Sequence, residues 1–273
     1  MDTELAALIE RLAKPTVMPM RSAESRQLTT LKTEVLTCGD FRSRVLVQES
    51  QDPQAKSALL LHGWGGHPMM LSDVKTLLQA QGYRVYMPFL LGHDPIARAR
   101  CDLTGQCALL LAMQATYGPF DCVVAHSAGG IITAMAHWLG FTLNQVALLS
   151  APASLPSLLQ HSLVQLQAPA HYLSVLSAHY QNGYPLPAAL QAAHPYTFDG
   201  VRALILHGTQ DQRVSPVDAR HIHAQLPAGQ LHMIEGTGHL GILSHQRTQQ
   251  LLAGYFFAQN AGREKGNSHA GAY

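Results

Sequence analysis

The hydrophobic residues of the chain fall mostly into short continuous runs, and glycine or proline stands near the ends of many of them. A continuous run of strand length is typical of a strand that helices cover on both faces of a sheet. One such strand is predicted at the start of residues 121–140, where a very tight turn and a helix follow it. The other predicted strands are residues 44–48, 57–61, 83–87, 145–149, 203–206 and 230–234.

Between these runs, hydrophobic positions recur at the spacing of a helix face. Proline at a first helical position and serine before it are typical helix starts. Helices are predicted between Pro68 and Gly82, over residues 103–117 and 243–257, and after Ser215 and Pro216. Strands and helices therefore alternate along the chain, which predicts the α/β class with a mainly parallel, doubly wound sheet.

Two stretches depart from this alternation. Residues 153–200 hold leucine-rich and alanine-rich helical pieces interrupted by prolines, a pattern that favours a cap or lid over a structureless loop. Near the N-terminus, apolar residues at helical spacing before Pro15 predict a short amphipathic helix that packs on the domain or on a partner. We expect a helical N-terminal extension at 1–40, a core at 41–152 and 201–260, a helical cap at 153–200, and a disordered polar tail at 261–273.

Composition and charge argue against several kinds of partner. Charged residues make up 13% of the chain, against about a quarter in typical domains, and the formal net charge is +1. Because no run of Lys or Arg occurs, we expect no nucleic-acid binding. Residues 122–141 are apolar, but His126, Ser127 and His137 within them favour a buried strand and helix, so we expect no stable membrane insertion.

The cysteines and the first residues bear on the compartment. The four cysteines form no Cys-x-x-Cys pair and are too few for a disulfide scaffold. Met1 is followed by the acidic residues Asp2 and Glu4, whereas a secretory signal begins with positive charge and continues with an apolar block. We therefore expect a reducing, cytoplasmic setting.

Ser127 stands where the tight turn within residues 121–140 must lie. Ala125, Ala128, Gly129 and Gly130 around it are small, so the backbone can fold sharply and lift one hydroxyl clear of the turn. A nucleophilic serine is displayed in this way. The alternative is an ordinary apolar strand that ends in Ser-Ala-Gly-Gly and continues into a helix.

Three loops that follow predicted strands hold complementary chemical groups, at Ser127, Asp211 and His239. In open α/β sheets, ligands bind beyond the carboxyl ends of the strands. A neutral imidazole at His239 would accept the proton of the Ser127 hydroxyl, and the Asp211 carboxylate would hold the ring and stabilise its charged form. The chain order Ser, Asp, His differs from the trypsin-like and subtilisin-like orders.

A tetrahedral oxyanion at Ser127 would need preorganised N–H donors. The backbone N–H of Ala128, at the start of the helix, can supply one donor, and that of Trp64 can supply another. Glycines on both sides of Trp64, at 63, 65 and 66, would let the backbone approach the substrate closely.

Four motifs together resemble the α/β-hydrolase superfamily, especially its compact esterases with a helical cap after the sixth strand. They are His-Gly-Trp-Gly-Gly at 62–66, Ala-His-Ser-Ala-Gly at 125–129, His-Gly-Thr-Gln-Asp at 207–211, and Gly-His at 238–239. The resemblance covers about residues 43–259 and implies that fold and a Ser127, Asp211, His239 triad. Ala125 replaces the usual first glycine of Gly-x-Ser-x-Gly, and we expect slight crowding but an intact turn.

Several of these residues have other interpretations. Asp211 could cap the turn before the following helix, and Glu235 is a rival carboxylate. His126, beside the nucleophile, is a candidate substrate-binding residue, although a structural role fits equally well. We expect no metal, because His221 and His223 face different ways on a helix and no His-Glu-x-x-His occurs, and no cofactor, because no phosphate loop or dinucleotide fingerprint is present.

The expected reaction is hydrolysis of a small-molecule carboxylic ester or thioester through an acyl-Ser127 intermediate. The apolar and aromatic cap with few charges suggests a neutral or acyl substrate rather than a polyanion. An acyltransferase or a C–C bond hydrolase would use the same triad, and a hydrolase-like ligand-binding protein would keep the pocket without turnover. The sequence leaves the oligomeric state open.

Overall fold

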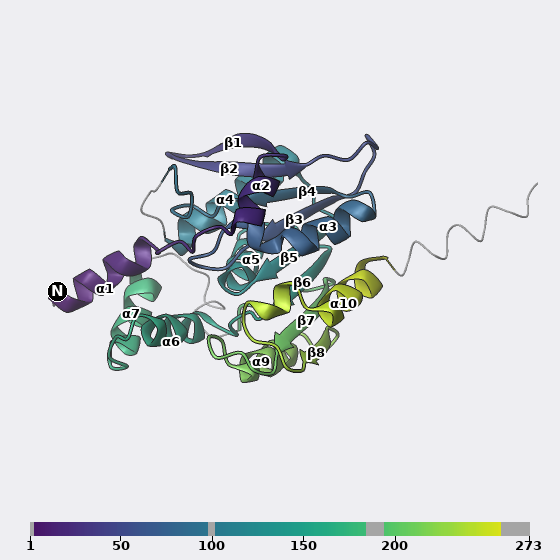
Figure 1. Ribbon diagram of the computed structural model, residues 1–273. Helices are drawn as coiled ribbons and strands as arrows, with labels where there is room; N and C mark the ends of the chain where they lie inside the picture. Colours follow the sequence, from purple (N-terminus) through teal and green to yellow (C-terminus); the bar gives the residue numbers. More distant parts are fainter. Residues whose placement is uncertain (1–2, 98–101, 184–193, 258–273) are drawn as a thin grey trace, which may run out of the picture.

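The computed structural model describes residues 3–97, 102–183 and 194–257. A single eight-stranded sheet with the strand order β1-β2-β4-β3-β5-β6-β7-β8 organises these residues (Figure 1). The β1-β2 and β2-β4 pairs are antiparallel and every other pair is parallel. This confirms the α/β class with a mainly parallel sheet. The strands are β1 (Lys32–Cys38), β2 (Phe41–Gln48), β3 (Ser57–Leu61), β4 (Arg84–Pro88), β5 (Cys122–His126), β6 (Gln145–Leu149), β7 (Arg202–Gly208) and β8 (Gln230–Ile234).

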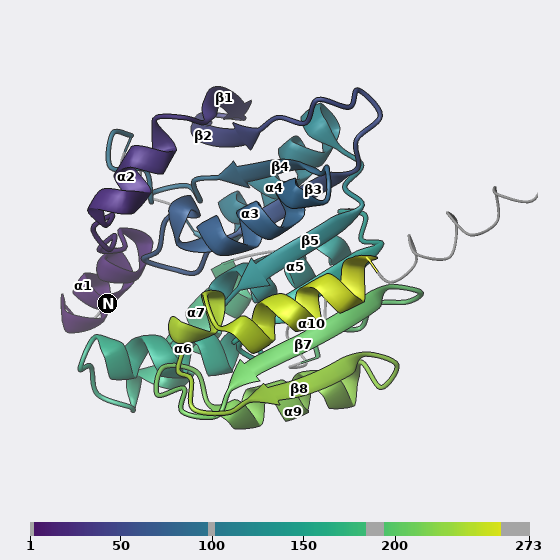
Figure 2. The same cartoon turned by 45° about the vertical axis from the view of Figure 1, so that its right-hand side comes forward.

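Helices cover both faces of this sheet, as Figure 2 shows with α3 and α10 on one face and α4 and α5 on the other. Successive side chains of a strand point to opposite faces. In β3, Leu59 and Leu61 pack in one buried cluster, while Ala58 and Leu60 pack in the other. The helices are α1 (Thr3–Ala13), α2 (Ser22–Leu28), η1 (Pro68–Leu71), α3 (Ser72–Ala80), α4 (Leu103–Tyr117), α5 (Ala128–Trp138), α6 (Leu155–Gln165), α7 (Tyr172–Gly183), α9 (Pro216–Gln225), η2 (Gly241–Leu243) and α10 (Gln246–Phe257).

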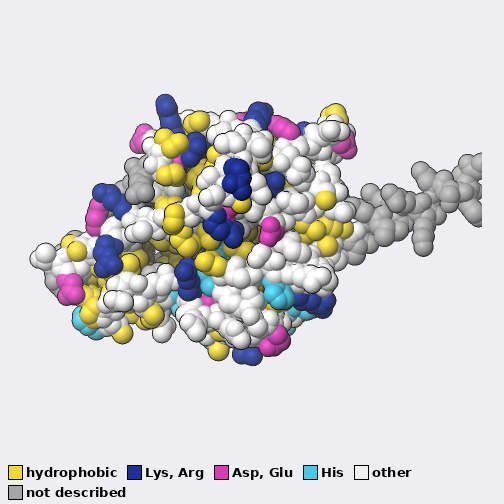
Figure 3. All heavy atoms as spheres, viewed as in Figure 1, with side chains coloured by type: hydrophobic (Ala, Val, Ile, Leu, Met, Phe, Trp, Pro, Cys, Tyr) yellow, Lys and Arg dark blue, Asp and Glu magenta, His cyan; other side chains and the backbone are white. Residues whose placement is uncertain are grey.

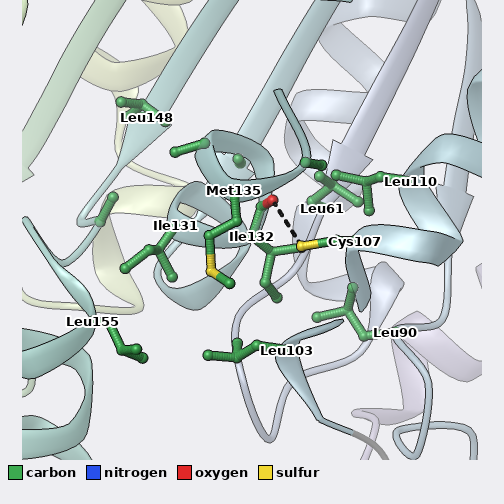
Figure 4. Close-up of a cluster of buried hydrophobic side chains, with 14 of the residues drawn as sticks. Leu61, Leu90, Leu103, Cys107, Leu110, Ile131, Ile132, Met135, Leu148 and Leu155 are labelled. Carbon is green, nitrogen blue, oxygen red and sulfur yellow. Dashed lines mark hydrogen bonds between the residues drawn. The ribbon is translucent and has the colours of Figure 1, made fainter. Parts of the chain in front are cut away.

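The contact between α4 and α5 holds the helix that follows Ser127. Figure 4 shows Cys107 of α4 beside Ile132 of α5, among leucines that include Leu61 of β3. The Cys107 thiol lies 4.0 Å from the Ile132 carbonyl oxygen, a distance at which it donates only a weak hydrogen bond. The buried cysteine therefore acts here mainly as a small apolar side chain.

The helices within residues 153–200 connect to both the core and the N-terminus. Ser157 and His161 of α6 both bind one carboxylate oxygen of Asp218 in α9, at 2.6 and 2.9 Å. On the other side, α1 buries its apolar face in the same cluster as α6 and α7, and the Tyr172 hydroxyl donates to Glu4 at 2.7 Å. The part of this stretch at 184–193 and the tail at 261–273 lie outside the described residues.

The structure differs from the sequence-based element predictions in a few places. Strand β4 begins and ends one residue later than predicted, and the helix after Pro68 begins as the short 3-10 helix η1. The final helix starts at Gln246, after η2, rather than at residue 243. The strand β1 lies within residues 1–40, where we expected a helical extension, so the sheet begins at Lys32. This edge strand exposes most of its side chains and lacks a continuous apolar run.

None of the helices that the structure describes is both long enough and apolar enough to cross a bilayer.

Candidate active site

Ser127 occupies a sharp turn between β5 and α5. Its φ of 54° and ψ of −126° lie in a region that residues other than glycine rarely adopt. Strain of this kind typically costs about 1–3 kcal/mol and persists only where the surroundings fix the backbone. Two backbone hydrogen bonds do so, from the Ser127 N–H to Leu149 and from the Gly130 N–H to Ser127, both at 2.9 Å. The turn forms with the fully buried Ala125 in the strand before it.

Two glycines allow the close packing around this turn. A Cβ atom at Gly63 would lie 2.8 Å from the Cβ atom of Ser127. A Cβ atom at Gly130 would lie 2.6 Å from the Cβ atom of Ala151. Both distances are too short for real side chains, so glycine is needed for the approach of the 62–66 loop and of α5 to the neighbouring backbone.

Ser127, His239 and Asp211 form a continuous hydrogen-bonded chain. The His239 Nε2 atom lies 3.0 Å from the Ser127 Oγ atom, and the Nδ1 atom lies 2.8 Å from Asp211 Oδ2. Because a carboxylate only accepts, Nδ1 carries the ring proton and Nε2 is free to accept the hydroxyl proton. The structure thus brings together the three residues that we expected from separate loops, in the geometry that a nucleophile and a general base require.

The Asp211 carboxylate is held in its charged form. Burial opposes ionisation, but hydrogen bonds from the His207 and His239 rings and from the backbone N–H of Val214 outweigh it and hold the Asp211 pKa well below its usual range. The backbone N–H groups of Arg213 and Val214 donate to Oδ1 at 2.8 and 2.9 Å. Asp211 therefore closes its own turn and orients His239 at the same time.

The loop that carries Trp64 lies against Ser127. Within the described chain, neither the Trp64 N–H nor the Ala128 N–H has a hydrogen-bond partner. Trp64 and Ser127 line the same cavity. Two unpaired backbone donors, one next to Ser127 in the chain and one in the loop that lies against it, are what an oxyanion hole needs.

Two buried histidines fix this loop. The His62 ring accepts from the Leu90 N–H at Nε2 and donates to the Gly63 carbonyl from Nδ1. The His93 ring accepts from the Gly65 N–H at Nε2, at 2.9 Å, and donates to Leu91 from Nδ1. Burial lowers the pKa of His93 to about 4 and that of His62 well below its usual value. Both rings are thus neutral near pH 7, with defined tautomers.

His126 is not among the described residues that line the cavity, and its substrate-binding role stays a prediction beside the equally expected structural one. Its Nε2 atom donates to the carbonyl oxygen of His239 at 3.0 Å, and the two rings lie 4.7 Å apart. Burial, with the neighbouring His239 ring, lowers the pKa of His126 to about 3. Its Nδ1 atom lies close to Gly63, so the ring stands between the loop that carries Trp64 and the loop that carries His239.

A cavity of about 560 Å³ opens above Ser127 and His239. The loop after β3 contributes Trp64 and Gly65 to its lining, and the loop after β7 contributes Arg213 and Val214. The side chains of α6 that line it include His161, which Asp218 holds in place. This volume is within the usual range for small-molecule sites.

One wall of the cavity comes from the N-terminal segment, which sequence reasoning did not connect with the site. The segment contributes Arg11, Leu12, Lys14, Pro15, Thr16 and Met18. The Met18 N–H donates to the Gly65 carbonyl at 2.8 Å, so the segment crosses the loop that carries Trp64. The prolines at 15 and 19 are the one sequence signal of an extended segment there.

The rival carboxylate lies apart from the hydrogen bonds that join Ser127, His239 and Asp211. Glu235 accepts a 3.3 Å hydrogen bond from Thr209 at the surface, and within the described part of the chain it forms no hydrogen bond or ion pair with His239. Over the described ranges, no group of three or more His, Cys, Asp or Glu side chains is placed to hold a metal ion.

The chain matches a known protein family in sequence and several solved structures in fold. The sequence profile of the Alpha/beta hydrolase family matches residues 58–251. Est1E from Butyrivibrio proteoclasticus is similar at 17% identity and a TM-score of 0.62, over 85% of this chain and 99% of that one. A thioesterase domain from the curacin biosynthetic pathway is similar at 15% identity and a TM-score of 0.61, over 83% and 99%. No curated protein matches the sequence.

A third similar structure is 2-hydroxy-6-oxo-6-phenylhexa-2,4-dienoate hydrolase from Rhodococcus sp. strain RHA1. It has 17% identity and a TM-score of 0.60, over 84% of this chain and 99% of that one. At these identities the three structures establish a shared fold, and the chemistry must be inferred from the site itself.

Proposed function

Since this chain belongs to the Alpha/beta hydrolase family, we propose that it is a serine hydrolase that cleaves a carboxylic ester or thioester through an acyl-Ser127 intermediate. The observation that carries the proposal is the contact of the Ser127 hydroxyl with His239 Nε2 at 3.0 Å, backed by Asp211 at 2.8 Å. A thioesterase domain and a hydrolase are among the solved structures that share the fold.

The proposed reaction begins as the Ser127 oxygen attacks the carbonyl carbon of the substrate. His239 Nε2 takes the hydroxyl proton as the new C–O bond forms, and Asp211 stabilises the charged ring. The backbone N–H groups of Trp64 and Ala128 stabilise the oxyanion. His239 then returns the proton to the departing alcohol or thiol as its bond to the carbonyl carbon breaks.

The second half of the reaction regenerates the enzyme. A water molecule gives its proton to His239 and attacks the acyl carbon. The bond to the Ser127 oxygen breaks, and that oxygen recovers the proton. The free carboxylic acid is released. Acyl transfer would replace water with another acceptor, so a comparison of product acids with transfer products separates the two reactions.

Residues 153–200 are proposed to act as a cap over this site, because α6 lines the cavity and is bound to α9 through Asp218. A small-molecule substrate fits a cavity of this size. A reducing, cytoplasmic setting is part of the proposal and rests on the cysteine usage, in which Cys107 and Cys122 are buried free thiols.

A fluorophosphonate probe tests the nucleophile. The wild-type protein should be labelled, and Ser127→Ala should not. Ser150→Ala is a matched control, because Ser150 also has a positive φ at the end of the neighbouring strand but is fully buried away from the cavity. Absence of labelling in folded wild-type protein would overturn the proposal.

A further inference from the structure

Two separate segments contribute positively charged residues to the lining of the cavity. Arg11 and Lys14 contribute to the wall formed by the N-terminal segment, and Arg213 contributes to the wall formed by the loop after β7. No Asp or Glu side chain is among the described residues that line the cavity. Figure 3 shows Lys and Arg side chains near α1 and across the hollow in the middle of this face. The ligand side of Ser127 is thus cationic, although the whole chain has a net charge of only +1.

These three cations differ in their contacts with carboxylates. Lys14 forms an exposed ion pair with Glu10 at 2.7 Å. Arg11 and Arg213 form no ion pair with any other residue that the structure describes. Their guanidinium groups remain available to a ligand, and a guanidinium group binds carboxylate or phosphate with two parallel hydrogen bonds.

The backbone holds both arginines in fixed positions. The Arg213 N–H donates to Asp211 Oδ1 at 2.8 Å, so this residue is attached to the acid of the candidate triad. Arg11 lies on α1, whose Leu8 and Leu12 are buried in the main core cluster. Both residues line the cavity, and they come from separate elements with an anchored backbone.

We propose that Arg11 and Arg213 bind an anionic group, a carboxylate or a phosphate, on the ester or thioester that Ser127 attacks. This inference rests on the proposed function and adds the substrate class. It narrows the expectation of a neutral or acyl substrate rather than a polyanion, which the composition of residues 153–200 suggests. The buried Leu155, Leu159 and Leu163 of that stretch pack in the core cluster, whereas the cations come from outside it.

Two pairs of substrates, matched in acyl length, test the proposal and locate the anion. In the first pair, p-nitrophenyl glutarate carries a carboxylate on the acyl side and p-nitrophenyl valerate does not. In the second pair, valeryl-coenzyme A carries phosphates on the leaving group and the valeryl thioester of N-acetylcysteamine does not. In at least one pair, the wild-type kcat/KM should be higher for the anionic member by about fivefold or more.

Arginine variants assign this preference to residues. Arg11→Gln and Arg213→Gln should each lower the ratio of anionic to neutral kcat/KM by about two- to fivefold, and the double variant should bring it close to one. Arg220→Gln is the matched control, because Arg220 is exposed on α9 and does not line the cavity. A merely structural effect would lower kcat/KM for both substrates of a pair together and would leave their ratio unchanged. Higher salt should reduce the wild-type ratio, because exposed charges are screened.

Binding to Ser127→Ala keeps this test independent of turnover. Isothermal titration with the same four compounds should show tighter binding of the anionic member and loss of that preference when Arg11 and Arg213 are both replaced. Equal kcat/KM and equal affinity within both pairs would overturn the proposal, as would a preference that the double variant retains. Failure to cleave all four compounds, with the binding preference intact, would instead count against the proposed function.

Discussion

The backbone N–H of Met18 donates a 2.8 Å hydrogen bond to the carbonyl oxygen of Gly65. This bond joins the segment that follows α1 to the loop that carries Trp64. Because α1 also shares a buried cluster with α6 and α7, its position is linked to the shape of the cavity above Ser127. A change in the packing of α1 should therefore affect catalysis as well as stability.

Leu8→Ala tests this link. Leu8 is 4% exposed in the core cluster, and replacement of a buried leucine by alanine costs about 2–5 kcal/mol of unfolding free energy. We predict a loss near the lower end of that range, because α1 lies at the periphery, together with a several-fold higher KM. Val35→Ala, at a position 61% exposed on β1, should change the unfolding free energy by less than about 0.5 kcal/mol. Urea unfolding and steady-state kinetics measure both effects, and an unchanged KM in a destabilised Leu8→Ala protein would refute the link.

Asp211→Asn should lower kcat by about 10³- to 10⁴-fold, because an amide stabilises neither the required His239 tautomer nor the charged ring. Glu235→Gln, which alters the rival carboxylate, should retain activity within about twofold. Glu235 lies at the surface, where a substitution outside the hydrogen bonds of the site has a small effect. Steady-state hydrolysis of one ester substrate suffices for the comparison. The reverse order of effects would assign the acid to Glu235.

The pH dependence of stability should reflect His93. Burial lowers its folded-state pKa to about 4, whereas an unfolded histidine has a pKa of about 6.5. Below about pH 6.5 the unfolded chain therefore binds a proton that the folded chain does not, and stability falls as the pH drops toward 4. Between pH 6.5 and 5, this one group should contribute a loss of about 2 kcal/mol.

His93→Gln provides the measurement for this prediction. Its amide oxygen can accept from the Gly65 N–H but takes up no proton, so the loss of stability between pH 6.5 and 5 should be smaller by about 2 kcal/mol than in the wild type. The exposed His221→Gln serves as the control. Urea unfolding curves at the two pH values give the result, and equal losses in the wild type and His93→Gln would count against a neutral His93 in the folded protein.

Gly130→Ala and Gly254→Ala form a matched pair of glycine substitutions in helices. At Gly130 the new methyl group would lie 2.6 Å from Ala151 and push α5 away from β6, which should cost about 1–3 kcal/mol and reduce kcat by displacing Ser127. At Gly254 in α10 a Cβ atom meets nothing within 4 Å. Alanine there should raise the unfolding free energy by about 0.5–1 kcal/mol. Thermal unfolding and activity assays compare the two, and a well-tolerated Gly130→Ala would contradict the close packing.

Much of the fold, and the meeting of the three candidate site residues, could be predicted from the sequence for a physical reason. Parallel strands buried on both faces leave continuous apolar runs, and their carboxyl ends meet at one edge of the sheet. Ser127, Asp211 and His239 each follow such a run, so the order of the elements alone indicated that they would meet. The contacts of His239 with Ser127 and Asp211 agree with that inference.

The features that sequence reasoning missed depend on contacts between distant segments. The edge strand β1 is largely exposed and carries no continuous apolar run, so its pairing with β2 left little trace in the sequence. The cavity wall at 11–18 and Arg213 are brought together only by the packing of α1. The contact of the His126 ring with the backbone of His239 joins residues far apart in the sequence and could not be predicted from it.

The most direct test of the central claim, that Ser127 is an acylated nucleophile, is mass spectrometry of protein quenched during turnover of an activated ester. We predict a mass increase of one acyl group, located by proteolysis on the peptide that contains Ser127, and no such adduct on Ser127→Ala. Turnover of the ester with no acylated peptide, or with the acyl group on another residue, would contradict the mechanism.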